Sequence, residues 1–296
     1  MKNFKTLYRL FAGMFILSLF TGCSSTEEVP AEPGLYFELM HPDASTSRVS
    51  DLGFEFDDVL GVYVTEAGSP LQLGGNAVNN ARMLNKNGTW SAEGTQKWGP
   101  GNYDVYAYYP YIPSPESVLE VPFALSADQS SLGTGDEPGG YEASDFLWAS
   151  AQGVTASATP VKLTFSHRLS RLVVNLVKGE DYEGELDDDA ITVRIHNTVA
   201  DGLLDLSTGY IMKDPYKSAR SLTAKPIGDH RFAAIVIPQR IETTVPLVEV
   251  IMDGVSYMVS TPFVFKFGMQ HTMNVTISKN PEQIKISIGG EMKDWN

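Results

Sequence analysis

The chain has 296 residues, of which 43% are hydrophobic and 20% charged, and this balance is typical of a folded globular protein rather than a disordered one. Its formal net charge of −14, with 22 basic residues against 36 acids, argues against general nucleic-acid binding. A single cysteine excludes an intramolecular disulfide and a zinc site made of four thiolates.

Residues 1–22 have the pattern of a secretory signal peptide. A basic N-terminal region precedes an apolar run from Leu10 to Phe20, which is too short to span a bilayer. The run ends in Phe20-Thr21-Gly22-Cys23, which resembles the lipobox of bacterial lipoproteins, where the cysteine sulfur receives a lipid. We therefore expect lipidation of Cys23 and a polar, proline-containing tether over residues 23–33.

From Gly34 onward the hydrophobic period is two rather than 3.6, which predicts half-buried β-strands instead of amphipathic helices. The predicted strands, in chain order, lie at residues 35–39, 60–64, 103–109, 161–165, 172–176, 191–195, 232–237, 248–252, 263–267, 273–277 and 284–288. Short strands of this kind bury one face against a second sheet, so the expected fold class is all-β, built as antiparallel sandwiches.

Residues 126–160 are rich in small and polar side chains, and we interpret them as a loop and a connector between domains. The length of the chain also suggests roughly two domains. The expected division is an N-terminal β-sandwich at residues 34–155 and a C-terminal β-sandwich at residues 156–296.

No sequence motif points to catalysis or to a bound cofactor. The five histidines show no metal-binding spacing, and there is no nucleophile elbow, phosphate-binding loop or dinucleotide fingerprint. The acidic run Asp187–Asp189 lacks the spacing of a calcium loop, so a solvated turn before the strand at Ile191 is favoured over a Ca²⁺ site. We expect no enzyme activity, no cofactor and no metal.

Tyrosines are concentrated between Tyr103 and Tyr111, and two interpretations fit them. Aromatic faces exposed along a strand could stack on sugar rings. Alternatively, strand alternation places one set of rings in the core while their hydroxyls find water or backbone, and this interpretation is favoured.

Four segments of the mature chain, taken in order, carry a family resemblance. They are Asn87-Gly88-Thr89-Trp90 with Lys97-Trp98, Tyr106-Ala107-Tyr108-Tyr109-Pro110-Tyr111, Asp145-Phe146-Leu147-Trp148-Ala149, and the run from Val161 to Ser170. Together with the lipobox they resemble the fimbrillin-like (Mfa-like) family of lipoproteins, the subunits of type V pili. The resemblance implies two transthyretin-like β-sandwich domains in tandem.

The resemblance also implies a mechanism of assembly. In that family a protease that cuts after arginine removes the first strand of a lipidated precursor, and a strand from the next subunit fills the groove that is left. On this chain Arg48 is the candidate cleavage site, with a new N-terminus at Val49. The donor candidate carries Ile284, Ile286 and Ile288 on one face, and Trp295 could anchor its end. The same segment is equally compatible with the last strand of its own sandwich.

The expected function is therefore that of a structural subunit of type V fimbriae that supports adhesion. We expect an outer-membrane, cell-surface lipoprotein that joins other fimbrial subunits head to tail. Further expected partners are the outer membrane, through the lipid, and host or bacterial surface ligands, but not nucleic acid. The alternatives are a fimbrial anchor or tip subunit and a monomeric surface lipoprotein that binds glycans.

Overall fold

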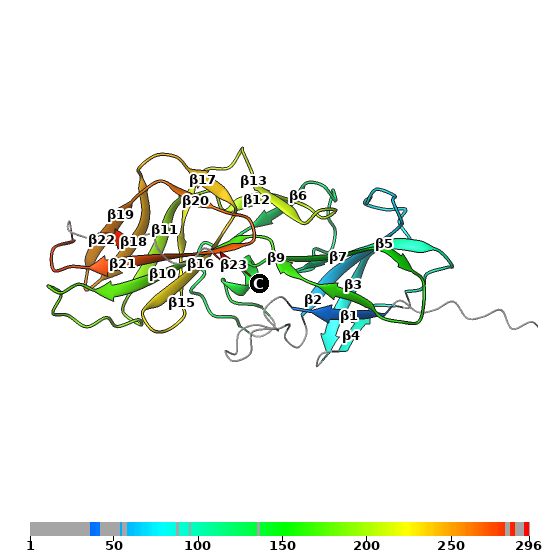
Figure 1. Ribbon diagram of the computed structural model, residues 1–296, viewed down its shortest axis with the longest axis horizontal. Coiled ribbons are helices and arrows are strands. Elements are labelled where there is room, and N and C mark those ends of the chain that lie inside the picture. Colours follow the sequence, from blue (N-terminus) through cyan, green and yellow to red (C-terminus); the bar gives the residue numbers. More distant parts are fainter. Residues whose placement is uncertain are drawn as a thin grey trace, which may run out of the picture. The chain divides into compact units, whose positions relative to one another are not determined.

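The computed structural model describes residues 36–41, 54, 58–86, 89–94, 96–134, 137–281, 285–287 and 293–295. These residues form β-strands and one short 3₁₀ helix, η2 (Glu142–Ser144), so the predicted all-β class is confirmed (Figure 1). Each of the strands predicted from hydrophobic alternation overlaps an observed strand.

The first large sheet is antiparallel and its central strands are buried on both faces. In spatial order the described strands of this sheet are β4 (Thr89–Ala92), β3 (Val78–Lys86), β2 (Val59–Glu66), β5 (Asn102–Tyr109), β7 (Leu147–Thr155) and β9 (Ser166–His167). Successive side chains of a strand point to opposite faces. Along β5, Val105 and Ala107 therefore join one apolar cluster, whereas Tyr106 and Tyr108 join another.

A parallel pair of short strands covers one of these faces. β1 (Phe37–Met40) pairs with β8 (Val161–Thr164), and the buried side chains of Val161 and Leu163 pack in the same cluster as Val105. Phe37 and Leu39 of β1 are half-buried against this cluster. A strand from the N-terminal end of the chain thus helps to close this core.

The second half of the chain forms a β-sandwich. One sheet consists of β15 (Lys225–Pro226), β16 (Arg231–Val236), β10 (Ser170–Lys178), β21 (Met269–Ile277) and β22 (Lys285–Ser287), with β23 (Lys293–Asp294) also paired to β21. The other consists of β14 (Arg220–Thr223), β11 (Thr192–Thr198), β18 (Pro246–Met252) and β19 (Val255–Ser260). Fully buried side chains such as Leu172 and Val174 of β10 and Val193 and Ile195 of β11 lie in one cluster between them.

Strand pairing crosses the domain boundary that we expect near residue 155. β6 (Val121–Ala124) pairs with β12 (Asp201–Asp205), which also pairs with β13 (Tyr210–Lys213), whereas β8 and β9 pair with strands from the N-terminal half. A further pair joins β17 (Gln239–Ile241) to β20 (Phe263–Phe265). The division into two transthyretin-like domains stays a prediction.

The interpretation of residues 126–160 as loop and connector was wrong for its last part. Residues 147–155 form β7, which lies between β5 and β9 in the first sheet. Only Leu147 and Ala149 of this strand are fully buried, and the rest is mostly small or polar. The strand is held by backbone pairing with its neighbours. Its small side chains therefore show little alternation between hydrophobic and polar residues.

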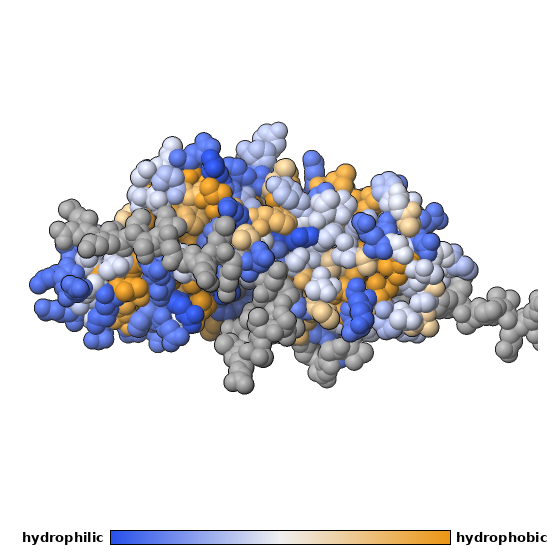
Figure 2. Space-filling model, in the orientation of Figure 1, coloured by the Kyte–Doolittle hydropathy of each residue, from blue (hydrophilic) through white to orange (hydrophobic). Residues whose placement is uncertain are grey.

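The exposed surface mixes apolar and polar side chains. In the view of Figure 2, orange apolar residues form separate patches between hydrophilic ones. The most exposed large apolar side chains are Tyr216 (93% exposed) and Leu132 (83% exposed), and both lie in loops. Scattered apolar residues of this kind are normal on a protein surface.

Candidate functional site

The predicted residues of the N-terminal region lie outside the described residues. This applies to Cys23, Arg48 and Val49. The structure describes β1 and His41 between Cys23 and Arg48, and it describes Phe54 and then the chain from Asp58 after Val49. In sequence, the candidate cleavage site therefore falls between β1 and β2.

β1 is held to β8 by four residue pairs, and alternate side chains of β1 pack on the apolar cluster that contains Val105. It pairs in parallel with β8, with Phe37 opposite Val161 and Leu39 opposite Leu163. The Val161 N–H donates to the Tyr36 carbonyl at 2.8 Å, and the Phe165 N–H donates to the Met40 carbonyl at 2.9 Å. Among the described strands, β8 is the only partner of β1. Loss of β1 would leave an unpaired backbone edge on β8 beside an apolar slot.

The outward side of β1 carries two exposed side chains, Glu38 and Met40. Glu38 lies 3.4 Å from Lys162 in an ion pair whose two side chains are both more than half exposed. Such pairs contribute little to stability, about 0–1 kcal/mol. The apolar residues of β1, rather than its charges, therefore hold it in place.

The C-terminal donor candidate is only partly described. Ile286 lies in β22, opposite Val275 of β21, in an antiparallel pair. Ile284 and Ile288 lie outside the described residues. In this conformation the described part of the segment is a strand of its own sandwich.

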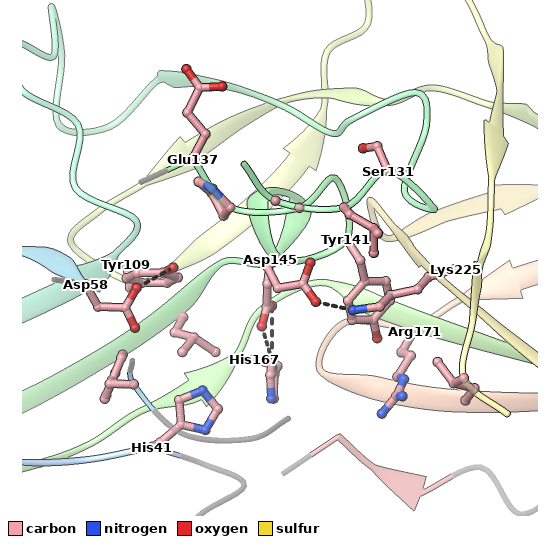
Figure 3. A pocket seen from close by; sticks show the side chains of 18 of the residues that line it. His41, Asp58, Tyr109, Ser131, Glu137, Tyr141, Asp145, His167, Arg171 and Lys225 are labelled. Carbon is pink, nitrogen blue, oxygen red and sulfur yellow. Dashed lines mark hydrogen bonds and ion pairs between the residues drawn. The ribbon is translucent and has the colours of Figure 1, made fainter. Parts of the chain in front are cut away.

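Trp295 fixes the C-terminal end of the described chain. It is 4% exposed, and its backbone N–H donates to the Gly268 carbonyl at 2.9 Å. Its ring stacks on His167 with a centroid distance of 3.9 Å and an interplanar angle of 4°. His167 in turn lies 2.9 Å and 3.0 Å from the two carboxylate oxygens of Asp145, as the dashed lines in Figure 3 show.

The two ends of the described chain meet at His167. The His41 ring, which directly follows β1, lies edge-on to the His167 ring with a centroid distance of 5.9 Å. One imidazole therefore contacts both the N-terminal strand region and the C-terminal tryptophan. The sequence suggested an anchoring role for Trp295, whereas Asp145 and His167 entered only as members of the segments that carry the family resemblance, with no sign that they contact each other.

The tyrosine-rich strand is mainly a core feature. Tyr103, Tyr106 and Tyr108 are 8%, 9% and 1% exposed, so the core interpretation is confirmed for these three residues. Burial raises the pKa of Tyr108 above its usual range, and burial likewise raises the pKa of the neighbouring Tyr63 to about 12. These rings are not available to a sugar.

Two further histidines, His196 and His230, form hydrogen bonds with side chains of the fold. His196 bonds the Ser221 hydroxyl at 2.6 Å and the Glu249 carboxylate at 3.0 Å, across neighbouring strands. His230 bonds Asp188 at 2.7 Å, in the acidic run predicted as a turn. The run does form a turn before β11, and it contributes a structural hydrogen bond.

A family model with the description Fimbrillin-like matches residues 47–295 of this sequence. The chain belongs to the fimbrillin-like family. No curated protein matches it.

Solved structures of low sequence identity share the fold of this fimbrillin-like chain. A candidate cell adhesion protein from Bacteroides ovatus has a TM-score of 0.65 and 21% identity, covering 90% of this chain and 98% of that one. Another from Bacteroides uniformis has a TM-score of 0.66 and 18% identity, covering 90% and 99%. The tip fimbrial protein Mfa3 from Porphyromonas gingivalis, with a C-terminal truncation, has a TM-score of 0.51 and 11% identity, covering 81% and 95%.

Family membership supports a fimbrial subunit at the cell surface that assembles with other fimbrial subunits. It also supports a structural rather than an enzymatic role. Among the described residues, no helix has the length and apolar character needed to cross a membrane.

Proposed function

We propose that this fimbrillin-like chain is the precursor of a structural subunit of type V fimbriae, exported as a lipoprotein and assembled by strand exchange. The observation that carries the proposal is the seating of β1. It is a short strand that pairs with β8, and its Phe37 and Leu39 are only half-buried against the apolar cluster around Val161 and Leu163. Arg48 follows it in the sequence, so a single cut would separate it from the body of the chain.

Removal of β1 would create a binding site for another strand. The freed edge of β8 would offer unpaired backbone groups, and the core beside Val161 and Leu163 would lose the side chains that cover it. An extended strand of a neighbouring subunit can restore both, through main-chain hydrogen bonds and alternate apolar side chains. Because the donor differs from the acceptor, the resulting contact is head-to-tail.

The proposed donor is the C-terminal segment with Ile284, Ile286 and Ile288. Ile286 is paired with Val275 of its own chain, so donation requires β22 to leave β21 first. The proposed membrane attachment is through a lipid on Cys23, which keeps the precursor at the outer membrane until Arg48 is cut.

The experiment is an analysis of the protein purified from cell surfaces. We expect multimer ladders that survive mild denaturant, and subunits within them that begin at Val49. Arg48→Ala should leave unprocessed monomer.

Ile286→Lys should abolish the ladders, since it forces a charge into an apolar groove. The matched control is Met258→Lys, on the exposed side of β19, which should leave them intact. Intact ladders from the Ile286→Lys protein would exclude this donor.

A second candidate is a terminal subunit, either anchor or tip, that does not donate a strand. The burial of Trp295 and the pairing of β22 and β23 with β21 favour it, because they hold the C-terminal segment on its own chain. A terminal subunit would appear about once per fimbria, whereas a stalk subunit would form the ladder itself.

A further inference from the structure

Figure 3 shows a cavity of about 420 Å³. Its lining includes both members of the His167–Trp295 stack. Its walls include His41 after β1, Asp58 before β2, residues from 131–133 and 137–145, Arg171 of β10, Lys225 of β15 and the C-terminal Trp295. Its volume falls in the range of small-molecule sites, about 300–1,000 Å³. Strand exchange, as proposed above, assigns no role to this cavity.

Arg171 is a cation in the wall of this cavity, and it has no ion-pair partner within the part of the chain that the structure describes. Its guanidinium lies 5.8 Å from the centroid of the Tyr141 ring and 5.9 Å from that of Trp295. Its Nε is buried and has no hydrogen-bond partner, and none of the ion pairs between described residues includes Arg171. A buried guanidinium nitrogen without an acceptor is unfavourable until an anion supplies one.

The carboxylates nearest to this end of the cavity already have cationic or imidazole partners. Glu142 pairs with Lys225, whose Nζ lies 5.5 Å from the centroid of the Tyr141 ring. Asp145 bonds His167. Among the described residues, therefore, no carboxylate pairs with Arg171, and a carboxylate is the group that its planar fork binds best.

The other end of the cavity has different chemistry. In Figure 3, Asp58 and Tyr109 lie on the opposite side of the cavity from Arg171, and the Tyr109 hydroxyl donates to Asp58 Oδ1 at 3.0 Å. Phe54, half-buried, packs edge-on to Tyr109 beside them. Aromatic faces next to hydrogen-bonding oxygens suit a sugar ring, which has apolar C–H faces and an edge of hydroxyl groups.

We propose that this cavity binds a carboxylated sugar. Arg171 holds the carboxylate through two parallel hydrogen bonds, the ring lies against the aromatic side chains, and Asp58 and Tyr109 bind hydroxyls at the far end. Sialic acids and uronic acids share this chemistry, and both occur at cell surfaces. The site thus gives a surface protein a means of recognising acidic glycans.

The test is calorimetric titration of the purified full-length chain in detergent with N-acetylneuraminic acid and with glucuronic acid. We expect saturable binding of one or both, and binding of the matching methyl ester that is at least about tenfold weaker, since esterification removes the charge that Arg171 pairs with. Failure of both acids to bind, equal binding of the ester, or equally tight binding of free glutamate would overturn the proposal.

Arg171→Gln should weaken binding of the acid by at least about tenfold and leave the weak binding of the ester unchanged. The matched control is Arg240→Gln, on the exposed side of β17 and outside the cavity walls, which should bind like the wild type. If Arg171→Gln does not fold, the comparison of acid and ester on the wild-type chain still decides the matter. Neither titration depends on strand exchange, so failure of one proposal leaves the other standing.

Discussion

His271 is a titratable side chain that is buried as a neutral ring. It is 8% exposed, and its Nε2 accepts a hydrogen bond from the Lys266 backbone N–H at 3.1 Å. Its ring lies edge-on to Phe263 with a centroid distance of 5.3 Å. Burial lowers the pKa of His271 below its usual value near 6.5, and the charge of Lys266 acts in the same direction. Protonation would remove the hydrogen-bond acceptor for the Lys266 N–H, and it would place a charge in an apolar environment.

This arrangement predicts a loss of stability on mild acidification. In the unfolded chain His271 takes up a proton near its ordinary pKa, whereas the folded chain resists protonation to a lower pH. The unfolded state therefore binds more protons below about pH 6.5, and the free energy of unfolding falls there by at most about 1.4 kcal/mol per pH unit from this residue. His271→Gln keeps an acceptor for the Lys266 N–H, and it should flatten the pH dependence in denaturant titrations between about pH 7 and about pH 5.

The internal control for His271→Gln is the range from about pH 7 to about pH 8.5, where the ring is neutral in both states and the two proteins should change in parallel. Parallel curves down to about pH 5 would instead show that His271 titrates alike in the folded and unfolded chains.

Single tyrosines show how far a residue can be predicted from the sequence. Alternation along Tyr103–Tyr109 predicts that one set of rings is buried, and the burial of Tyr106 and Tyr108 on one face confirms it, while Tyr103 is buried in the cluster on the other face. The sequence could not show that the strand is buried on both faces, since that depends on which distant segments cover each side. It also could not distinguish Tyr109, which lines the cavity, from its neighbours.

At the scale of the element, β1 is the strand on which the proposed assembly depends. Glu38 and Lys162 are directly opposite across β1 and β8, and both side chains point to solvent. Cα atoms of such partners on neighbouring strands lie roughly 5 Å apart, within the range that a disulfide spans. A disulfide at this position would tie β1 to the chain even after cleavage at Arg48.

We predict that the double variant Glu38→Cys, Lys162→Cys forms no multimers when oxidised and forms them again after reduction. The substitutions remove only an exposed ion pair, so the fold should lose no more than about 1 kcal/mol. Gel analysis of surface protein with and without dithiothreitol measures the result. Glu38→Cys alone is the control and should assemble under both conditions. Normal ladders from a fully cross-linked sample would mean that β1 need not leave.

Strands differ in how well the sequence predicts them. β10 and β21 alternate large aliphatic residues with polar ones, because one face meets the core of the sandwich, and both were predicted. β7 was missed since its small side chains carry almost no periodic signal. Its place in the sheet follows from backbone pairing with β5, which no local pattern encodes.

At the scale of the whole molecule, the cavity and the terminal contacts could not be predicted from the sequence. Arg171 and Lys225 each look like ordinary strand residues, and Asp58 like a loop acid. Their common location arises only when the two halves of the chain pack against each other. Hydrophobic alternation predicted the all-β class, and the resemblance predicted the fimbrillin-like family, because it uses the order of many segments rather than any single residue.

Trp295 connects the stability of the molecule to its proposed assembly. Its ring stacks on His167 and is the group that a truncation removes, whereas its backbone N–H bonds the Gly268 carbonyl in any variant that keeps this backbone. Trp295→Ala should lower the free energy of unfolding by about 3–5 kcal/mol, the usual cost of truncating a buried tryptophan. Much of this loss should be local, since the contacts removed are those that hold the C-terminal segment on its own sandwich.

A segment held less tightly should be donated more readily. We therefore predict that Trp295→Ala forms multimers faster than the wild type at equal processing of Arg48, measured as ladder growth over time after protease addition. Trp295→Phe, which keeps an aromatic ring over His167, should lie between the two. If Trp295→Ala is less stable yet yields no multimers, the C-terminal segment is not a donor, and the burial of Trp295 marks a terminal subunit whose last strand remains in its own sheet.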